Sequence, residues 1–205
     1  MQIAIIGAGN VGRALGRGFA RAGHGLIYGV RDPKAEKYAE PPVPGAAVMS
    51  VKAAGAAGDV VILATPWAGT QSAVEALGDL GGRPLLDATN PIGPGFALTL
   101  GHTDSGGEQV ARWATGARVV KVFNTIGADN MTAPDYGAQR AFMPVSGDDP
   151  AACAVAVELA EGLGFEALHI GGLATARRTE PLAMLWIGLA MGQKDRTIAF
   201  GLLRR

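Results

Sequence analysis

The sequence is poor in the residues that build disulfide frameworks and metal centres. It has one cysteine, Cys153, and three isolated histidines, His24, His102 and His169. A single cysteine excludes an internal disulfide and favours a reducing compartment. Because Cys153 lies among alanines and valines, we expect a small core residue rather than a nucleophile. No spacing of these residues is typical of metal ligands, so no metal site is predicted.

The sequence also lacks an excess of charge of either sign. Eighteen basic residues balance eighteen acidic ones, so no net field attracts nucleic acid or an anionic membrane. No stretch interleaves basic and aromatic side chains as nucleic-acid binders do. We therefore expect neither nucleic acid nor a membrane among the partners.

Long hydrophobic runs are missing as well. The longest late apolar run, Pro181 to Gly192, is shorter than the roughly 20 residues that cross a bilayer. The first residues already have the pattern of a structural strand, which argues against a signal peptide. Together these features predict a cytoplasmic protein.

The chain does contain enough apolar material for a well-buried core. Hydrophobic residues make up 48% of it and charged residues 18%, a composition that excludes a disordered protein. A length of 205 residues fits one domain, residues 1–205.

The first twelve residues carry the strongest motif. An apolar run, Gln2 to Ile6, is followed by Gly7-Ala8-Gly9-Asn10-Val11-Gly12 and then by residues with helical spacing. In such a unit Gly7 permits the tight turn, Gly9 lets the backbone approach phosphates, and Gly12 lets helix and strand pack closely. The N–H groups and dipole of the helix start then favour an anion. Glycine is abundant, with 31 residues, so the context rather than the motif alone supports a dinucleotide site.

The second predicted strand ends in residues suited to a phosphate. Residues 25–30 are followed by Arg31-Asp32-Pro33-Lys34, where the adenosine ribose is expected. Arg31 offers a bidentate grip and Lys34 a second charge, which favours the 2′-phosphate of NADP(H). The alternative is that Asp32 binds the ribose of NAD. Asp32-Pro33 is equally typical of a helix N-cap and first helical position, which needs no ligand.

Three further apolar runs end in polar side chains. Their unbroken hydrophobicity predicts parallel strands that are buried on both faces, at residues 59–64, 84–89 and 118–123. The polar residues that follow these strands are Thr65, Asn90 and Asn124. Because parallel strands end at one edge of a doubly wound sheet, where ligands bind, these side chains should converge near the nicotinamide. Its carboxamide needs both a donor and an acceptor. Thr-Pro and Asn-Pro pairs also mark ordinary turns, so each residue alone is a weaker signal.

A glycine-rich loop precedes the last of these three strands. It runs from Gly101 to Glu108, and Ser105-x-x-Glu108 has the spacing of a capping box. The loop is either a mobile lid over the site or a plain surface connection. It holds His102, the histidine that we expect nearest to the chemistry.

The remaining patterns complete an α/β fold. Residues 46–49, 141–146 and 165–170 predict strands, and residues 150–163 an amphipathic helix. The whole predicts a doubly wound Rossmann fold with a mostly parallel sheet of about eight strands and short C-terminal helices. Residues 174–205 form a helical extension. Its segment Pro181 to Met191 is apolar all round, so we expect it to pack against a second subunit.

Five stretches of the sequence resemble the NADPH-dependent deazaflavin (coenzyme F420) reductases. That family includes the related cytosolic domain of transmembrane metalloreductases, and the resemblance covers nearly the whole chain. The stretches are residues 7–12, residues 29–31, Ala64-Thr65-Pro66-Trp67, Asp87-Ala88-Thr89-Asn90-Pro91 and Lys121-Val122-Phe123-Asn124-Thr125.

The resemblance implies a Rossmann domain, usually dimeric, that moves hydride between NADP(H) and a flavin-like acceptor. It also implies that NADP contacts the glycines together with Asn10, Val11, Arg31 and Lys34. It further implies that a second set of residues lies along the nicotinamide side of the cofactor: Ala64, Thr65, Pro66, Trp67, Asn90 and Asn124. The sequence matches no specific deazaflavin-binding set, so the acceptor, whether deazaflavin, FMN or FAD, is left open.

The length of the C-terminal part bears on the mechanism. Related NADP dehydrogenases add a substrate domain of about a hundred residues or more, and here roughly thirty-five residues follow the last strand. We therefore expect an open nicotinamide face, which suits a planar acceptor, because ring-to-ring hydride transfer needs alignment more than an acid. No side chain is predicted to be an indispensable catalytic group. The alternatives are an imine, ketone or hydroxy-acid reductase using His102 or Lys121 as the acid, and a non-catalytic redox sensor.

Overall fold

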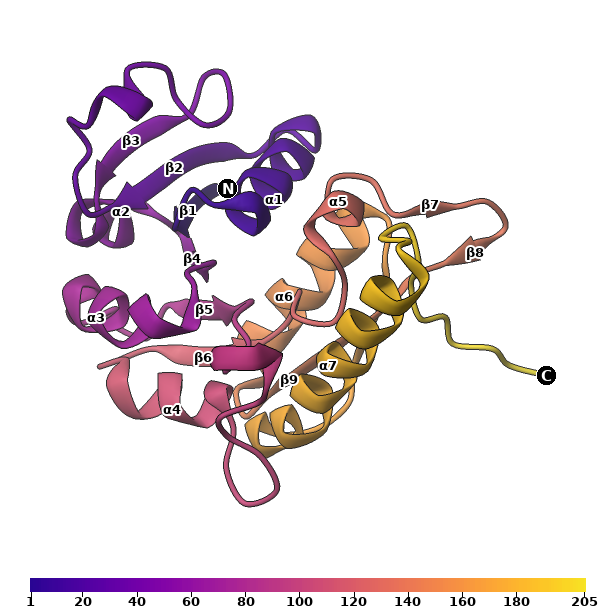
Figure 1. The fold of residues 1–205 in the computed structure, drawn as a ribbon. Helices are drawn as coiled ribbons and strands as arrows, with labels where there is room; N and C mark the ends of the chain where they lie inside the picture. The colour runs from indigo at the N-terminus through magenta and orange to yellow at the C-terminus, as the bar shows by residue number, and fades with distance from the viewer.

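A twisted sheet forms the centre of the computed structural model, which describes all residues from 1 to 205 (Figure 1). Six of its strands are parallel to one another: β1 (Gln2–Ile6), β2 (Gly25–Val30), β3 (Ala47–Ser50), β4 (Val60–Leu63), β5 (Pro84–Asp87) and β6 (Arg118–Lys121). They lie in the order β3-β2-β1-β4-β5-β6, the strand order of a Rossmann fold.

Two later strands extend the sheet beyond β6. They are β9 (Phe142–Gly147), antiparallel to β6, and β10 (Glu166–His169), parallel to β9. The predicted mostly parallel sheet of about eight strands is thereby confirmed. A separate hairpin of β7 (Asp135–Tyr136) and β8 (Gln139–Arg140) was not predicted, since two-residue strands carry no hydrophobic period.

Helices cover both faces of the sheet, each over its own apolar core (Figure 1). The larger core lies under α1 (Asn10–Arg21), α5 (Ala128–Met131) and α6 (Pro150–Leu163). The smaller core lies under α2 (Val51–Ala57), α3 (Trp67–Leu77) and α4 (Gly106–Trp113). Three 3₁₀ turns complete the connections: η1 (Glu36–Tyr38), η2 (Pro94–Phe96) and η3 (Leu173–Thr175).

The C-terminal part differs from the prediction. Instead of short helices, one long helix, α7 (Ala176–Gln193), runs across the molecule from α4 toward α5 (Figure 1). Its segment Pro181 to Met191 packs partly on the chain's own core, since Ala183, Trp186 and Ala190 are buried. The indole N–H of Trp186 donates to the carbonyl of Ile198 at 2.8 Å, which holds the following non-helical segment. This side of the segment is therefore covered by the chain itself, and the contact of the segment with a second subunit stays a prediction.

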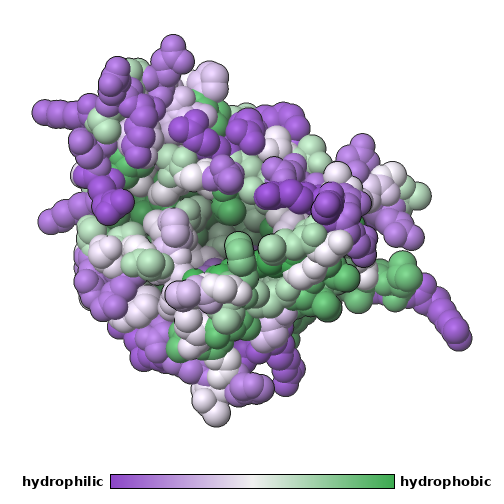
Figure 2. Space-filling view, viewed as in Figure 1, coloured by the Kyte–Doolittle hydropathy of each residue, from purple (hydrophilic) through white to green (hydrophobic).

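The other side of α7 carries the helix's exposed apolar residues, Leu185, Leu189 and Met191. Apolar residues gather over α7 and the C-terminal segment in the view of Figure 2. No helix of the molecule combines the length and the hydropathy needed to cross a membrane.

Candidate cofactor site

The glycine turn between β1 and α1 is shaped by close backbone contacts. Gly7 has a φ of 106°, and a Cβ there would lie 2.5 Å from the carbonyl oxygen of Ala64. A Cβ on Gly12 would lie 2.1 Å from the carbonyl oxygen of Gly7. Both glycines are therefore required by the packing of the protein itself, as the motif predicts.

Gly9 is different, because nothing in the protein requires a glycine there. Its backbone is extended, with φ −78° and ψ −168°, and a Cβ would meet no atom within 4 Å. No side chain caps the start of α1, and its first turn holds no acidic residue. The start of this helix thus offers uncapped N–H groups beside open space, which suits an anion such as a pyrophosphate.

Two side chains from outside the turn fix its carbonyl groups. Arg13 donates from Nε to the carbonyl of Ala8 at 2.9 Å, and the Tyr28 hydroxyl donates to the carbonyl of Gly12 at 3.0 Å. Burial raises the pKa of Tyr28 to about 12, so its phenol stays protonated as a donor.

The end of β2 presents two exposed cations. Arg31 and Lys34 form no ion pair, so both charges are free to bind a phosphate. Asp32 accepts a hydrogen bond at Oδ1 from the backbone N–H of Lys34 at 3.0 Å. The next element is the short turn η1 rather than an α-helix, so the N-cap interpretation of Asp32 was wrong. Its carboxylate instead stabilises a local Asx turn.

The end of β4 lies against the glycine turn. Ala64 and Thr65 are the neighbours that a Cβ on Gly7 would touch. The Thr65 hydroxyl lies 3.0 Å from the hydroxyl of buried Thr70, which in turn donates to the carbonyl of Pro66 at 3.2 Å. Thr65 is therefore positioned beside the glycine turn, and no hydrogen bond joins it to the other strand ends.

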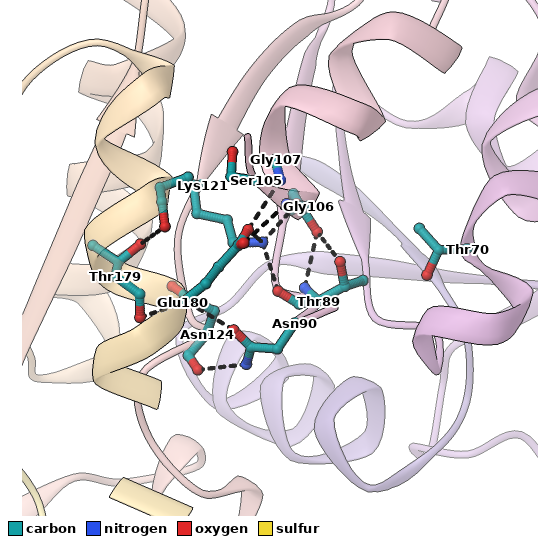
Figure 3. Close-up of polar contacts among 12 residues, drawn as sticks. Thr70, Thr89, Asn90, Ser105, Gly106, Gly107, Lys121, Asn124, Thr179 and Glu180 are labelled. Carbon is teal, nitrogen blue, oxygen red and sulfur yellow. Dashed lines mark hydrogen bonds and ion pairs between the residues drawn. The ribbon is translucent and has the colours of Figure 1, made fainter. Parts of the chain in front are cut away.

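Asn90 and Asn124, which follow β5 and β6, do come together (Figure 3). Asn90 donates from Nδ2 to the carbonyl of Asn124 at 2.8 Å, and Asn124 donates from Nδ2 to Oδ1 of Asn90 at 3.0 Å. Two of the three strand-end side chains thus meet, as the parallel topology requires.

A buried lysine lies directly behind this pair of amides. Lys121 donates from Nζ to Oδ2 of Asp87 at 2.8 Å and to the carbonyl of Thr89 at 2.6 Å. It also forms an ion pair with Oε1 of Glu180 on α7 at 2.8 Å. Asp87 accepts two further bonds at Oδ1, from the N–H and hydroxyl of Thr89. The ammonium group therefore has three partners and no open position.

This environment determines the charge state of Lys121. Burial by itself would lower the pKa of the ammonium group, but the adjacent carboxylates of Asp87 and Glu180 outweigh it and the pKa is raised. Lys121 is thus a fully buried cation without access to a substrate, which argues against the alternative that uses it as a proton donor.

Glu180 extends the same cluster to the start of α4. It accepts hydrogen bonds from the N–H groups of Gly106 and Gly107, at 2.9 and 3.0 Å, as Figure 3 shows. The pattern of the sequence did not reveal this residue. A lysine within an apolar strand demands buried carboxylate partners, but nothing local indicates that one of them comes from the last helix.

Side chains of the β4 and β5 connections pack around the same helix start. A Cβ on Gly106 would lie 3.1 Å from the ring of Pro91 and 3.3 Å from the indole of Trp67. Trp67 is half-buried against Trp113 of α4, with 5.6 Å between the ring centroids. Ser105 caps α4 by accepting from the N–H of Glu108 and donating from its hydroxyl to the carboxylate of Glu108. Only this half of the predicted capping box forms, because the backbone N–H of Ser105 donates to Asp104 rather than to Glu108.

The histidines and the cysteine lie elsewhere. His102 is on an exposed turn, with a φ of 55° and no hydrogen bond to the strand-end amides. His24 packs edge-on against Phe19, and Nε2 of His169 is within hydrogen-bond distance of the carbonyl of Gly147 at the end of β9 and that of Gly171 after β10. Cys153 is buried in the larger core, and burial raises the pKa of its thiol. A depression of about 500 Å³ along α6 and β10 is separate from the strand-end edge.

The face of the molecule in Figure 2 is hollowed near its centre, between the part formed by β1–β3 and α7. The glycine turn, the free cations after β2 and the amide pair each follow the end of a parallel strand, so they belong to one sheet edge. That arrangement can hold an extended dinucleotide with its phosphates at α1.

A family model described as NADP oxidoreductase, coenzyme F420-dependent, matches residues 2–91. Metalloreductase STEAP3 of Rattus norvegicus is 29% identical over 186 residues, which cover 90% of this chain and 37% of that protein. The chain thus spans little more than a third of the length of this curated relative.

Two solved structures match over nearly their whole length, and a third shares the fold over part of a longer chain. A protein from Arthrobacter sp. FB24, whose name describes it as an F420-dependent NADP-reductase, is 33% identical, with a TM-score of 0.92 and full coverage of both chains. A hypothetical protein from Sinorhizobium meliloti is 30% identical, with a TM-score of 0.79, covering 100% of this chain and 96% of that one. A reductive aminase from Aspergillus terreus, 23% identical with a TM-score of 0.68, covers 93% of this chain and 62% of that one and shares the fold.

Proposed function

Because the chain belongs to the family of coenzyme F420-dependent NADP oxidoreductases, we propose that it transfers a hydride between NADP(H) and a flat, flavin-like acceptor. Bound NADPH supplies the hydride from its nicotinamide ring. The acceptor gains that hydride with its two electrons and takes any further proton from water. The chain's own contribution is to bind, align and shield the two rings.

The observation that carries the proposal is the free space in front of Gly9. Gly7 and Gly12 are explained by the chain's own packing, whereas no contact within the protein requires a glycine at position 9, and the close approach of a ligand would account for it. The uncapped start of α1 provides N–H donors at the same place. A pyrophosphate fits both features, with Asn10 and Val11 in the first turn of that helix.

The unpaired cations support the phosphorylated form of the cofactor. Arg31 and Lys34 stand at the end of β2, where the adenosine ribose of a dinucleotide lies in this fold. Neither is neutralised by a protein carboxylate, and Asp32 is occupied in its own turn. A 2′-phosphate would supply the missing negative charge.

The nicotinamide would then lie along the ends of β4, β5 and β6. The residues proposed to line it are Ala64, Thr65, Pro66, Trp67, Asn90 and Asn124. None of them is an acid or base suited to proton transfer near neutral pH, and His102 lies on an exposed turn. This agrees with a reaction that depends on ring alignment rather than on a protein proton donor.

Stopped-flow oxidation of NADPH tests this function directly. The purified protein is mixed with NADPH and, in separate runs, FMN, FAD or the deazaflavin F420. Oxidation with at least one of them supports the proposal. Tight binding of NADPH without oxidation by any of them would instead support a redox sensor.

The His102→Ala variant tests whether hydride transfer needs a proton donor from the protein. We expect it to retain the wild-type rate of hydride transfer within about threefold. A loss of about 10³ in the chemical step, with NADPH binding intact, would contradict this mechanism.

We also propose that two copies of the chain associate through the exposed side of α7. Leu185, Leu189 and Met191 are 54%, 37% and 59% exposed on that helix. Leu185 and Leu189 are one helical turn apart and share a face, and exposed apolar side chains of this size are commonly covered by a partner.

A further inference from the structure

Phe123 has a backbone conformation that is unusual for its residue type. It follows β6 with a φ of 63°, and its ring is fully buried. Bulky residues avoid this left-handed region, and such strain persists only where the surrounding structure imposes it. The strained residue directly precedes Asn124, so the backbone is held in the orientation that sets the position of this amide.

The orientation of the two amides is fixed by backbone carbonyls. Asn90 must present Nδ2 to the carbonyl of Asn124, which can only accept, and its Oδ1 therefore faces Asn124. Asn124 donates from Nδ2 to that Oδ1 and, at 3.3 Å, to the carbonyl of Thr179 on α7. Flipping either amide would place two acceptors or two donors against each other.

One polar atom of this cluster is left without a partner. Oδ1 of Asn124 accepts no hydrogen bond from the protein, and the residue is only 4% exposed. A buried acceptor without a donor is unfavourable, so this oxygen calls for a donor that the side chains and backbone around it do not supply. Because the atom can only accept, that group must be an N–H or O–H donor.

Glu180 fixes the position of α7, the helix whose Thr179 carbonyl accepts from the Asn124 amide. It is the residue after Thr179, and its carboxylate is clamped by the N–H groups of Gly106 and Gly107 and by Lys121. Lys121 also binds Asp87 and the carbonyl of Thr89, so the same charge network fixes the backbone that leads to Asn90. Both halves of the amide pair are thus anchored to one buried cluster.

We infer that Glu180 is a positioning residue, which through Thr179 keeps Oδ1 of Asn124 turned toward the ligand as an acceptor for the carboxamide N–H of nicotinamide. This inference rests on the proposed function. It adds that Oδ1 of Asn124 is the hydrogen-bond acceptor for the nicotinamide and that Glu180 keeps it in place. Glu180 itself touches neither the cofactor nor the acceptor.

A pair of cofactors that differ in one N–H group tests the inference. The dissociation constant is measured for NADPH and for the reduced 3-acetylpyridine analogue, in which a methyl group replaces the carboxamide NH₂ and the carbonyl remains. We expect the wild-type protein to bind NADPH about tenfold more tightly than the analogue, because the analogue cannot donate this one neutral hydrogen bond. In Asn124→Leu the two constants should become equal within about twofold.

Glu180→Gln is the variant that separates positioning from folding. It keeps the length of the side chain and one oxygen acceptor but removes the charge that binds Lys121. We expect the preference for NADPH over the analogue to fall to about threefold or less. Glu161→Gln, a matched change at an exposed acid of α6, should leave the preference at its wild-type value.

A merely structural role predicts another result. If Glu180→Gln lowers the thermal midpoint but keeps the tenfold preference, the positioning role is overturned. If Asn124→Leu keeps the preference, Asn124 is not the acceptor. Should Glu180→Gln fail to fold, Asn90→Ala removes the other lock on the same amide and must lower the preference in the same way. Failure of the wild-type protein to bind either cofactor would refute the proposed function instead.

Discussion

Lys121 and Glu180 form an ion pair in which Nζ and Oε1 are 2.8 Å apart, with side chains that are 0% and 1% exposed. The pair joins the centre of the sheet to the last helix and, through the N–H groups of Gly106 and Gly107, to the start of α4. Such a pair does not by itself imply high stability, since both charges lose their water. Its geometric effect is to fix three segments at the edge where the strands end.

Removing one member of this cluster should be costly. Lys121→Met would leave the carboxylates of Asp87 and Glu180 buried without a cation, and we expect the free energy of unfolding to fall by about 3–5 kcal/mol. Urea denaturation followed by circular dichroism measures this loss. A change below about 1 kcal/mol would mean that water or a rearranged side chain replaces the ammonium group.

Gly9 and Gly12 should respond in opposite ways to the same substitution. Gly9→Ala places its methyl group in open space, so stability should stay within about 0.5 kcal/mol of wild type while NADPH binding weakens by about tenfold or more. Gly12→Ala forces a clash with the carbonyl of Gly7 and should destabilise the fold by about 1–3 kcal/mol or more. Thermal melts and calorimetric titration distinguish the two. Unchanged NADPH affinity in Gly9→Ala would place the pyrophosphate elsewhere.

Arg31 should determine the preference for the 2′-phosphate. Loss of a charged hydrogen bond costs about 1.5–3 kcal/mol, so Arg31→Ala should weaken NADPH binding roughly 10- to 100-fold and leave NADH binding almost unchanged. Lys34→Ala should show a smaller effect of the same kind, since its ammonium is a point charge. Titration calorimetry with both cofactors measures the ratio. Equal losses of affinity for NADH and NADPH would mean that Arg31 contacts a part of the cofactor that both share.

Tyr28 should make stability depend on pH in the alkaline range. Burial raises its pKa from 10.0 to about 12, so the folded protein favours the neutral phenol. The resulting stability is present below pH 10 and is lost as the pH rises from 10 to about 12, by about 1.4 kcal/mol per unit. Urea unfolding at several pH values, compared with Tyr28→Phe, isolates this contribution. Parallel curves for the two proteins would show that the phenol does not titrate differently on folding.

The exposed side of α7 should control association if the proposed dimer forms. Leu185→Glu combined with Leu189→Glu places charges on that side without touching the buried Ala183 and Trp186. Sedimentation at micromolar concentration should then change from dimer to monomer, with the fold retained. A monomeric wild-type protein under the same conditions would contradict the proposal.

The sequence alone predicted the features that local sterics and periodicity control. The apolar runs of β1, β4, β5 and β6 require burial on both faces, and that requirement leads to parallel strands whose ends meet. Gly7 and Gly12 follow from the turn between the first strand and helix. The meeting of Asn90 with Asn124 follows from topology, because each residue lies just after a central strand.

Only the tertiary structure decided which distant groups complete that edge. A buried lysine must find carboxylates, but whether Glu180 supplies one depends on how α7 crosses the sheet, and no local pattern encodes that path. The same crossing buries Trp186 and exposes Leu185, although both belong to one apolar run. Local sequence sets the conformation of each segment. The pairing of buried charges and the choice of buried faces are settled by packing among segments far apart in the chain.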